Sequence, residues 1–211
     1  MTTAVLSLLA LASALLTIRA EYRGPRRQIY IFKPLTVVLV ILIALQTKSA
    51  AAPPYKHLVV AGLLCSLAGD VLLIWPRERF VAGLVCFLFA HLCYIAAFTA
   101  GGGARALSAW GAAALAVYGA LMLRLLWPRL GKLKAPVVVY VAAILLMAWQ
   151  GLNRWLAAGG AGSALALAGA LLFVASDSAL AWNRFKGEFK SAQALVLGTY
   201  FVAQWLIALS T

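Results

Sequence analysis

Long apolar stretches separated by short polar connections run along the whole chain. Each stretch is close to the roughly 20 residues that an α-helix needs to cross about 30 Å of hydrocarbon. Eight such stretches can be drawn, near residues 2–18, 29–46, 57–75, 80–99, 106–126, 135–152, 161–182 and 191–210. The pattern predicts an all-α, polytopic integral membrane bundle of eight transmembrane helices, in which residues 1–211 form a single domain.

The composition agrees with this interpretation. Of the 211 residues, 65% are hydrophobic and only 11% are charged, whereas the apolar share of a soluble globular domain is about one half. The first apolar stretch has no basic segment before it and is followed by the cluster from Arg19 to Arg27 instead of a cleavage site. We therefore interpret it as a retained helix and not as a signal peptide.

The basic residues are distributed unevenly between the connections. The net charge of +13 is the balance of 18 Lys and Arg against five Asp and Glu. Most of the Lys and Arg lie in or beside the connections that follow the first, third, fifth and seventh stretches. The positive-inside rule makes this side cytoplasmic and places both termini outside the cytoplasm. The charge is spread over short loops and forms no stripe, so we expect membrane lipid as a partner and no nucleic acid.

Two acidic residues, Asp70 and Asp177, fall inside apolar stretches. An Asp at the centre of a spanning helix costs about 2.5 to 3.5 kcal/mol on insertion scales, so an intramembrane carboxylate indicates a functional site. The segments Ala68–Arg77 and Ala175–Arg184 share the pattern Ala-small-Asp-x-x-Leu-x-Trp-x-Arg. The spacing from each Asp to its Arg predicts both carboxylates at one depth, about 10 Å from the cytoplasmic boundary. A true internal repeat and a chance match both remain open.

Small and hydroxyl-bearing residues flank both aspartates. Gly69 precedes Asp70, and Ser176 and Ser178 enclose Asp177. Such residues let helices approach closely and offer hydrogen bonds. The sequence therefore favours two helices that meet at a pair of carboxylates. The alternative is that each Asp is structural and binds only a neighbouring hydroxyl or backbone group.

Further polar residues lie in stretches that begin or end at the same membrane surface. They are His91, Tyr94, Tyr140, Tyr200 and Gln204. Singly, each is as often an interhelical hydrogen-bonding residue as a functional one, but together they would line a pocket open to the cytoplasmic half. Lys33, before Pro34, has two interpretations: a snorkelling interfacial lysine, which is slightly favoured, or an ammonium group that binds a lipid phosphate.

Other kinds of site have little support. The chain has only two His residues, far apart in the predicted helices, so we expect no metal and no other cofactor. The three cysteines lie inside predicted helices, which favours packing over disulfides. No Gly-x-Ser-x-Gly elbow is present. The Gly-x-Gly-Asp motif of intramembrane aspartyl proteases would need Gly where the chain has Leu67.

Several short motifs occur in a fixed order along nearly the whole chain. They are Lys33-Pro34-Leu35, Gly69-Asp70, the run Phe80, Gly83, Phe87, His91 and Tyr94, the segment Ser176-Asp177-Ser178 with Leu180, Ala181 and Phe185, and Tyr200 with Gln204. In this order they resemble the YhhN/TMEM86 family, the lysoplasmalogenases. The resemblance implies hydrolysis of the sn-1 vinyl ether bond of a lysoplasmalogen or related lysophospholipid, without a cofactor, to a fatty aldehyde and a glycerophospho-alcohol. It also points to a bacterial inner (cell) membrane.

Vinyl ether hydrolysis fits a pair of carboxyl groups. One carboxylic acid delivers a proton to the β-carbon, and one carboxylate stabilises the oxocarbenium ion or activates water, as in glycosidases. Asp70 and Asp177 are therefore the expected catalytic pair, with the acid not assigned between them. Lys33 is expected to hold the phosphate. The residues expected to bind substrate or to support the pair are Lys33, His91, Tyr94, Tyr140, Ser176, Ser178, Tyr200 and Gln204.

Two functions of other classes remain open. A proton-coupled transporter or lipid flippase would use the same aspartates as proton sites, and would form no product in detergent without a gradient. A non-catalytic lipid-binding protein would bury the aspartates against the backbone with no cavity. A cavity between the third and seventh stretches would argue against that last function. No oligomeric state follows from the sequence.

Overall fold

The computed structural model describes residues 2–47, 53–75, 79–100 and 108–211. In these ranges the backbone forms eight long helices and no strand. The helices are α1 (Thr3–Arg23), α2 (Arg26–Gln46), α3 (Pro53–Ile74), α4 (Phe80–Thr99), α5 (Ala109–Leu126), α6 (Lys134–Ala158), α7 (Gly160–Ala181) and α8 (Ala192–Leu209). Each is long and apolar enough to cross a membrane. The predicted all-α bundle of eight spanning helices is confirmed.

Three short elements connect the second half of the bundle. Two 3₁₀ turns, η2 (Trp127–Arg129) and η3 (Gly131–Leu133), join α5 to α6, and a π-helical turn, η4 (Trp182–Lys186), continues α7. Helix α6 runs past its predicted end at residue 152, and two polar residues of this added part contact other helices or their caps. Asn153 accepts hydrogen bonds from the backbone and hydroxyl of Ser108, and the Arg154 guanidinium lies 4.1 Å from the Tyr55 ring centroid.

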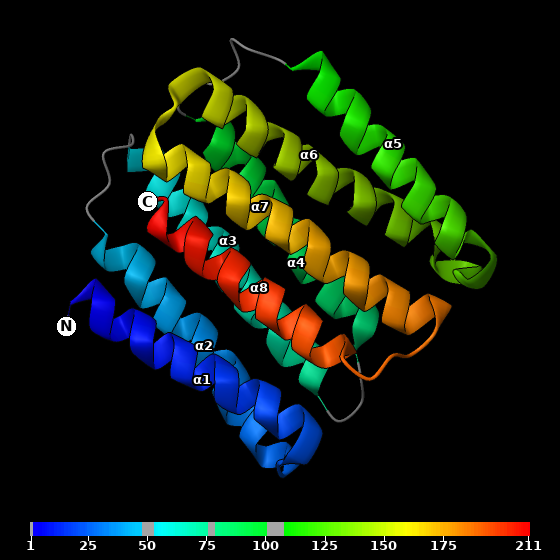
Figure 1. The fold of residues 1–211 in the computed structure, drawn as a ribbon, viewed down its shortest axis with the longest axis horizontal. Helices are drawn as coiled ribbons and strands as arrows, with labels where there is room; N and C mark the ends of the chain where they lie inside the picture. The colour runs from blue at the N-terminus through cyan, green and yellow to red at the C-terminus, as the bar shows by residue number, and fades with distance from the viewer. Residues whose placement is uncertain (1, 48–52, 76–78, 101–107) are drawn as a thin grey trace.

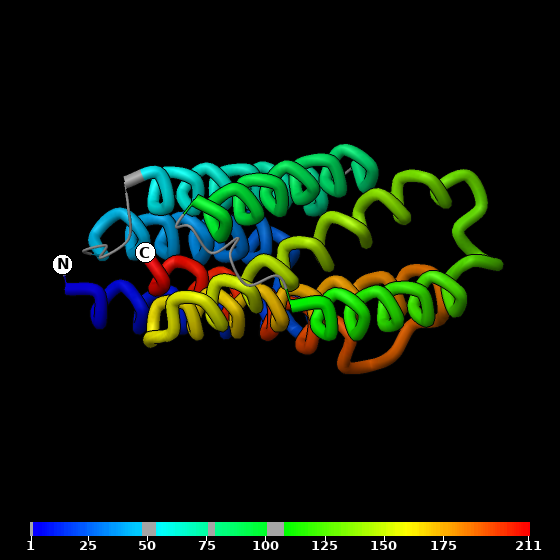
Figure 2. The backbone as a smooth tube through the Cα atoms, turned by 90° about the horizontal axis from the view of Figure 1, so that it is seen from above, coloured from blue at the N-terminus to red at the C-terminus, as the bar shows by residue number. Residues whose placement is uncertain are grey.

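The helices lie in two layers (Figures 1 and 2). Helices α1, α8, α7 and α5 form one layer, α2, α3 and α4 form the other, and α6 crosses between them. Helix α8 packs along α7 and also against α1 and α2, whereas α5 packs mainly along α6. Consecutive helices run in opposite directions, so both termini lie at one end of the bundle (Figure 1).

Glycine residues bring particular helix pairs close together. A Cβ atom at Gly169 of α7 would lie 2.8 Å from the backbone oxygen of Ala203 on α8. On α3, Gly62 and Gly69 leave room for the rings of Tyr94 and Phe87, which a Cβ would meet at 2.4 and 2.7 Å. Small residues permit such close approach between spanning helices. They let the aromatic rings of α4 reach the middle of the bundle.

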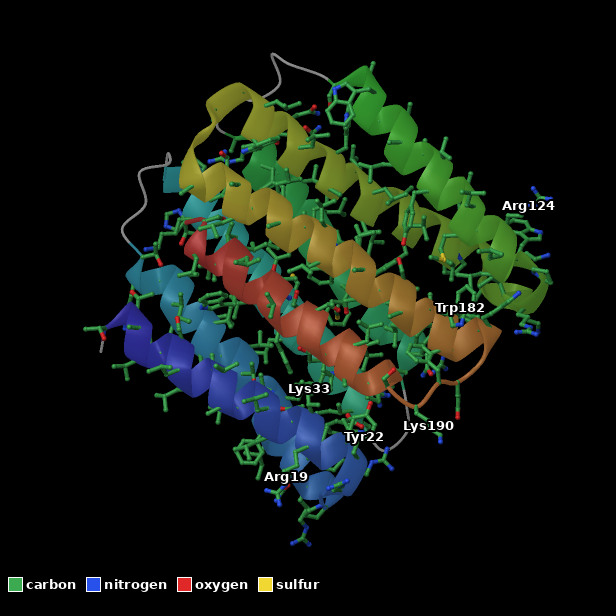
Figure 3. The ribbon with its side chains drawn as sticks, viewed as in Figure 1. Arg19, Tyr22, Lys33, Arg124, Trp182 and Lys190 are labelled. Atoms are coloured by element: carbon green, nitrogen blue, oxygen red, sulfur yellow. The ribbon has the colours of Figure 1, made fainter. Side chains whose placement is uncertain are left out.

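The end of the bundle opposite the termini carries much of the basic charge. Figure 3 labels Arg19, Arg124 and Lys190 at or near this end, with Trp182 close by. Arg77, which belongs to the predicted connection between the third and fourth stretches, lies outside the described residues. The charge asymmetry therefore distinguishes the two ends of the bundle, and that the basic end is cytoplasmic stays a prediction.

Candidate functional site

The first carboxylate, Asp70 on α3, is buried in contact with two other helices. Only 1% of its surface is exposed. The Lys33 ammonium nitrogen on α2 lies 3.1 Å from Asp70 Oδ1, and the Tyr200 hydroxyl on α8 donates a 2.6 Å hydrogen bond to Oδ2. A buried carboxylate needs such partners, because an isolated charge in an apolar interior is very costly.

Lys33 does not snorkel to the membrane surface. Its side chain is 11% exposed and turns inward to Asp70. The slightly favoured interpretation of Lys33 as a snorkelling interfacial lysine is therefore wrong. The reason is a buried acidic partner on a neighbouring helix, which holds the ammonium group inside the bundle. The hydropathy of the sequence does not reveal such a partner.

The second carboxylate, Asp177 on α7, belongs to a different cluster. The Tyr140 hydroxyl on α6 donates a hydrogen bond to Asp177 Oδ2. His91 Nε2 on α4 lies 3.0 Å from the Tyr140 hydroxyl and 3.7 Å from the same carboxylate oxygen. His91 is fully buried, whereas the Asp177 side chain is 16% exposed. Tyr140 therefore holds one carboxylate oxygen of Asp177, while part of the Asp177 side chain stays exposed.

Aromatic rings pack around both clusters. The Phe173 ring centroid lies 4.8 Å from that of His91 and 5.5 Å from that of Tyr200, and Phe87 packs edge-on against Tyr200 at 5.8 Å. Within the described residues α3 and α7 make no extensive contact with each other, whereas α4 packs along α3 and α8 along α7. The expectation that the two aspartate helices meet directly is therefore wrong, because hydropathy does not specify which helices are neighbours.

One cavity nevertheless joins the two carboxylates. Its volume is about 810 Å³, within the size range of small-molecule sites, which are mostly apolar with a few placed polar groups. The predicted site residues that line it are Lys33, Asp70, Tyr140, Ser176, Asp177, Ser178 and Tyr200. Arg129, Lys186 and Glu188, from the connections at the basic end, also line the cavity. The cavity therefore extends from the basic end of the bundle to both aspartates.

The remaining predicted site residues lie behind the cavity wall. His91, Tyr94 and Gln204 are fully buried and are not among the described residues that line the cavity. The Tyr94 hydroxyl donates a 2.7 Å hydrogen bond to Gln204 Oε1 and so links α4 to α8. Ser176 lines the cavity, but its hydroxyl donates to the Val196 carbonyl on α8 at 2.9 Å. Tyr94, Gln204 and Ser176 therefore join helices, and His91 reaches Asp177 through Tyr140.

Sequence analysis did not single out Tyr118 on α5. Its hydroxyl shares a 2.6 Å hydrogen bond with Ser178, beside Asp177, and both residues line the cavity. The available signal was its position, as a polar side chain in the middle of an otherwise apolar stretch. The described residues contain no group of three or more His, Cys, Asp or Glu side chains that would hold a metal ion.

Comparisons with known proteins give a consistent family. The YhhN family matches residues 28–211. The uncharacterized membrane protein YhhN of Escherichia coli O157:H7 is 34% identical over 200 residues, which cover 94% of each chain. Lysoplasmalogenase TMEM86B of Sus scrofa is 38% identical over 158 residues, 74% of this chain and 64% of the relative. Lysoplasmalogenase TMEM86A of Homo sapiens is 36% identical over 172 residues, 75% and 67% respectively. No solved structure matches.

Proposed function

The chain belongs to the YhhN family, and from this premise we propose that it is a membrane hydrolase of lysoplasmalogen or a related lysophospholipid. The reaction cleaves the sn-1 vinyl ether bond and releases a fatty aldehyde and a glycerophospho-alcohol. Two observations support the proposal: relatives that share more than a third of the aligned residues are named lysoplasmalogenases, and the cavity joins two carboxylates.

The observation that carries the mechanism is the difference between the surroundings of the two carboxylates. Asp70 is paired with the Lys33 ammonium, which supplies a countercharge to a carboxylate at this position. Asp177 is bound by the Tyr140 hydroxyl and lies near the His91 imidazole. Two carboxyl groups whose environments differ in this way are suited to opposite roles in acid–base chemistry. We assign Asp177 as the acid and Asp70 as the carboxylate.

In the first step Asp177 acts as the acid and protonates the β-carbon of the vinyl ether. Because Tyr140 donates to Oδ2, the acidic proton is carried on Oδ1. The π electrons of the double bond form the new C–H bond, and an oxocarbenium ion results. The negative charge of Asp70 stabilises this cation, as a carboxylate does in glycosidases.

In the second step water adds to the cation, and its proton passes to Asp70. The resulting hemiacetal then collapses. Asp177, now a carboxylate, takes the proton from the hemiacetal hydroxyl, while Asp70 returns its proton to the departing glycerol oxygen. Both carboxyl groups end in their starting states. His91 contacts neither substrate nor water in this scheme, and its hydrogen bond fixes Tyr140 and thereby Asp177.

Different regions of the cavity suit the alkenyl chain and the head group of such a lipid. Apolar side chains, including Leu84, Val137 and Ile144, suit the alkenyl chain. At the basic end Arg129, Lys186 and Glu188 offer both signs of charge to a zwitterionic head group. The Lys33 ammonium is already paired with Asp70, so the basic residues at this end are better placed for the phosphate. A cavity of this kind also argues against a non-catalytic role with enclosed aspartates.

The decisive experiment uses the purified protein in detergent, where no gradient exists. Incubation with a lysoplasmalogen should release a fatty aldehyde, detected by a coupled aldehyde dehydrogenase. The matched control is the lysophospholipid with a saturated sn-1 ether, which contains no double bond to protonate and should stay intact. Folded protein that releases no aldehyde would contradict the hydrolase and favour the transporter, whose activity would then appear only in liposomes with a gradient.

We also propose that the protein resides in the inner (cell) membrane of a bacterium with its basic end in the cytoplasm. The distribution of Lys and Arg supports this orientation. An alkaline phosphatase fused after Thr211 should be active and a green fluorescent protein at the same position should be dark, because the proposed orientation puts both termini outside the cytoplasm. The reverse pattern would contradict the proposed orientation but would not bear on the hydrolase proposal.

A further inference from the structure

A single hydrogen bond closes one side wall of the cavity. The hydroxyl groups of Tyr118 on α5 and Ser178 on α7 lie 2.6 Å apart, and both residues line the cavity. Tyr118 is also 38% exposed. Its neighbours Val117 and Leu121 are exposed apolar residues, as expected of a helix face that contacts lipid. Tyr118 therefore separates the cavity from the hydrocarbon of the membrane.

Little else joins these two helices. Helix α5 packs along α6 and against η2 and η4, and in the described part of the chain no extensive contact joins α5 to α7. Figure 1 shows α5 at the margin of the bundle with α6 behind the space between α5 and α7. A helix held mainly by one neighbour separates from the others more easily than one packed on all sides. Few contacts therefore close the side of the cavity between α5 and α7, which we call the gap.

The gap lies at the depth of the chemistry. Ser178 follows Asp177 directly, and Tyr118 lies eight residues before the end of α5 at Leu126, about 12 Å along the helix. Met122 of α5 and Val141 of α6 continue an apolar surface along the cavity. A lipid whose head group sits at the basic end would thus place its sn-1 bond near Asp177 and its chain at the gap.

We propose that the alkenyl chain of the lipid substrate enters the site sideways from the membrane, between α5 and α7, and that Tyr118 closes this path. The inference rests on the proposed function for its substrate. Sideways entry keeps the chain in apolar surroundings throughout. Entry from the basic end would instead draw the whole chain out of hydrocarbon and past the charged side chains of Arg129, Lys186 and Glu188, which the hydrophobic effect opposes.

The experiment places an obstruction in the gap and compares two substrates. A Tyr118→Cys variant is labelled with a bulky maleimide, and kcat/KM is measured before and after labelling. One substrate is a long-chain lysoplasmalogen, and the other is a short-chain, water-soluble vinyl ether analogue that enters from the basic end. Labelling should lower kcat/KM for the long-chain substrate about tenfold or more and change that for the short-chain analogue by less than about twofold.

The controls use neighbouring and native residues. A Val117→Cys variant carries the same label one residue away, on the lipid side and outside the cavity lining, and should keep its kcat/KM for both substrates. The unaltered chain, treated identically, reports any effect of labelling Cys65, Cys86 or Cys93. An equal loss for both substrates at Tyr118→Cys would mean that the label distorts Asp177, and no loss for either would mean that the chain enters elsewhere. Both results would overturn the proposal.

A binding measurement separates this inference from the proposed function. If the unaltered protein releases no aldehyde from either substrate, the hydrolase proposal fails, and the path is tested with a lysophospholipid that carries a diazirine within its chain. After irradiation, mass spectrometry should find crosslinks on α5 and α7 beside Tyr118 and Ser178, and these should be lost when Tyr118→Cys is labelled. Crosslinks confined to other helices would overturn the sideways path.

Discussion

The ammonium nitrogen of Lys33 and Oδ1 of Asp70 lie 3.1 Å apart in the interior of the bundle. The pair joins α2 to α3, and both residues line the cavity. Two opposite charges that share a buried position stabilise each other, but either one alone carries the full cost of its lost hydration. The candidate site and the stability of the bundle therefore both depend on the contact between Lys33 and Asp70.

Replacement of Lys33 alone should destabilise the protein. Lys33→Met leaves Asp70 buried without its cation, and we expect the free energy of unfolding to fall by about 3 to 5 kcal/mol. Thermal unfolding in detergent measures the change. The double variant Lys33→Met/Asp70→Leu, which removes both charges, should regain most of the stability and release no aldehyde. A single variant as stable as the parent would mean that the pair does not form in the membrane protein.

The two aspartates should both be required for catalysis. Asp70→Asn and Asp177→Asn keep the shape of the side chain and remove its acid–base chemistry, so each should lower kcat for aldehyde release by about 10² to 10⁴. Asp70→Asn also leaves the Lys33 ammonium without its partner and should be the less stable of the two. Aldehyde release and the thermal midpoint are measured on the same preparations. Full activity of either variant would remove that residue from the mechanism.

Hydropathy predicted the number, type and approximate bounds of the helices because a bilayer sets both their length and their apolar character. It also located Asp70 and Asp177 as misplaced charges. It did not reveal that Lys33 turns inward, because the rotation of a helix about its axis is fixed by packing. Hydropathy also did not predict which helices pack against α3 and α7, since eight antiparallel helices can pack in many different arrangements.

Tyr140 should act on Asp177 through a hydrogen bond, and His91 should act through Tyr140. Tyr140→Phe removes the donor to Asp177 Oδ2 and should lower kcat about tenfold to a hundredfold, with a smaller effect on KM. His91→Phe loosens Tyr140 and should lower kcat less. In a double-mutant cycle the His91 substitution should add almost nothing once Tyr140 is Phe. Additive losses would instead indicate that His91 acts on the substrate directly.

The contact between α7 and α8 should tolerate no added methyl group at Gly169. A Cβ there would lie 2.8 Å from the Ala203 carbonyl oxygen and 3.2 Å from the Ile207 backbone nitrogen. Backbone atoms cannot turn aside as a side chain does, so Gly169→Ala must push the helices apart. We expect a loss of about 1 to 3 kcal/mol in the free energy of unfolding.

The matched control for Gly169 lies on the facing helix. Gly198 has no atom within 4 Å of its built Cβ position, so Gly198→Ala should leave the thermal midpoint unchanged or raise it, because Ala favours a helix over Gly by up to about 1 kcal/mol. Separation of α7 and α8 would also move Asp177 relative to Tyr200, the hydrogen-bond partner of Asp70. Gly169→Ala should therefore lose activity together with stability, and a variant that keeps both would show that this close contact does not set the spacing of the two carboxylates.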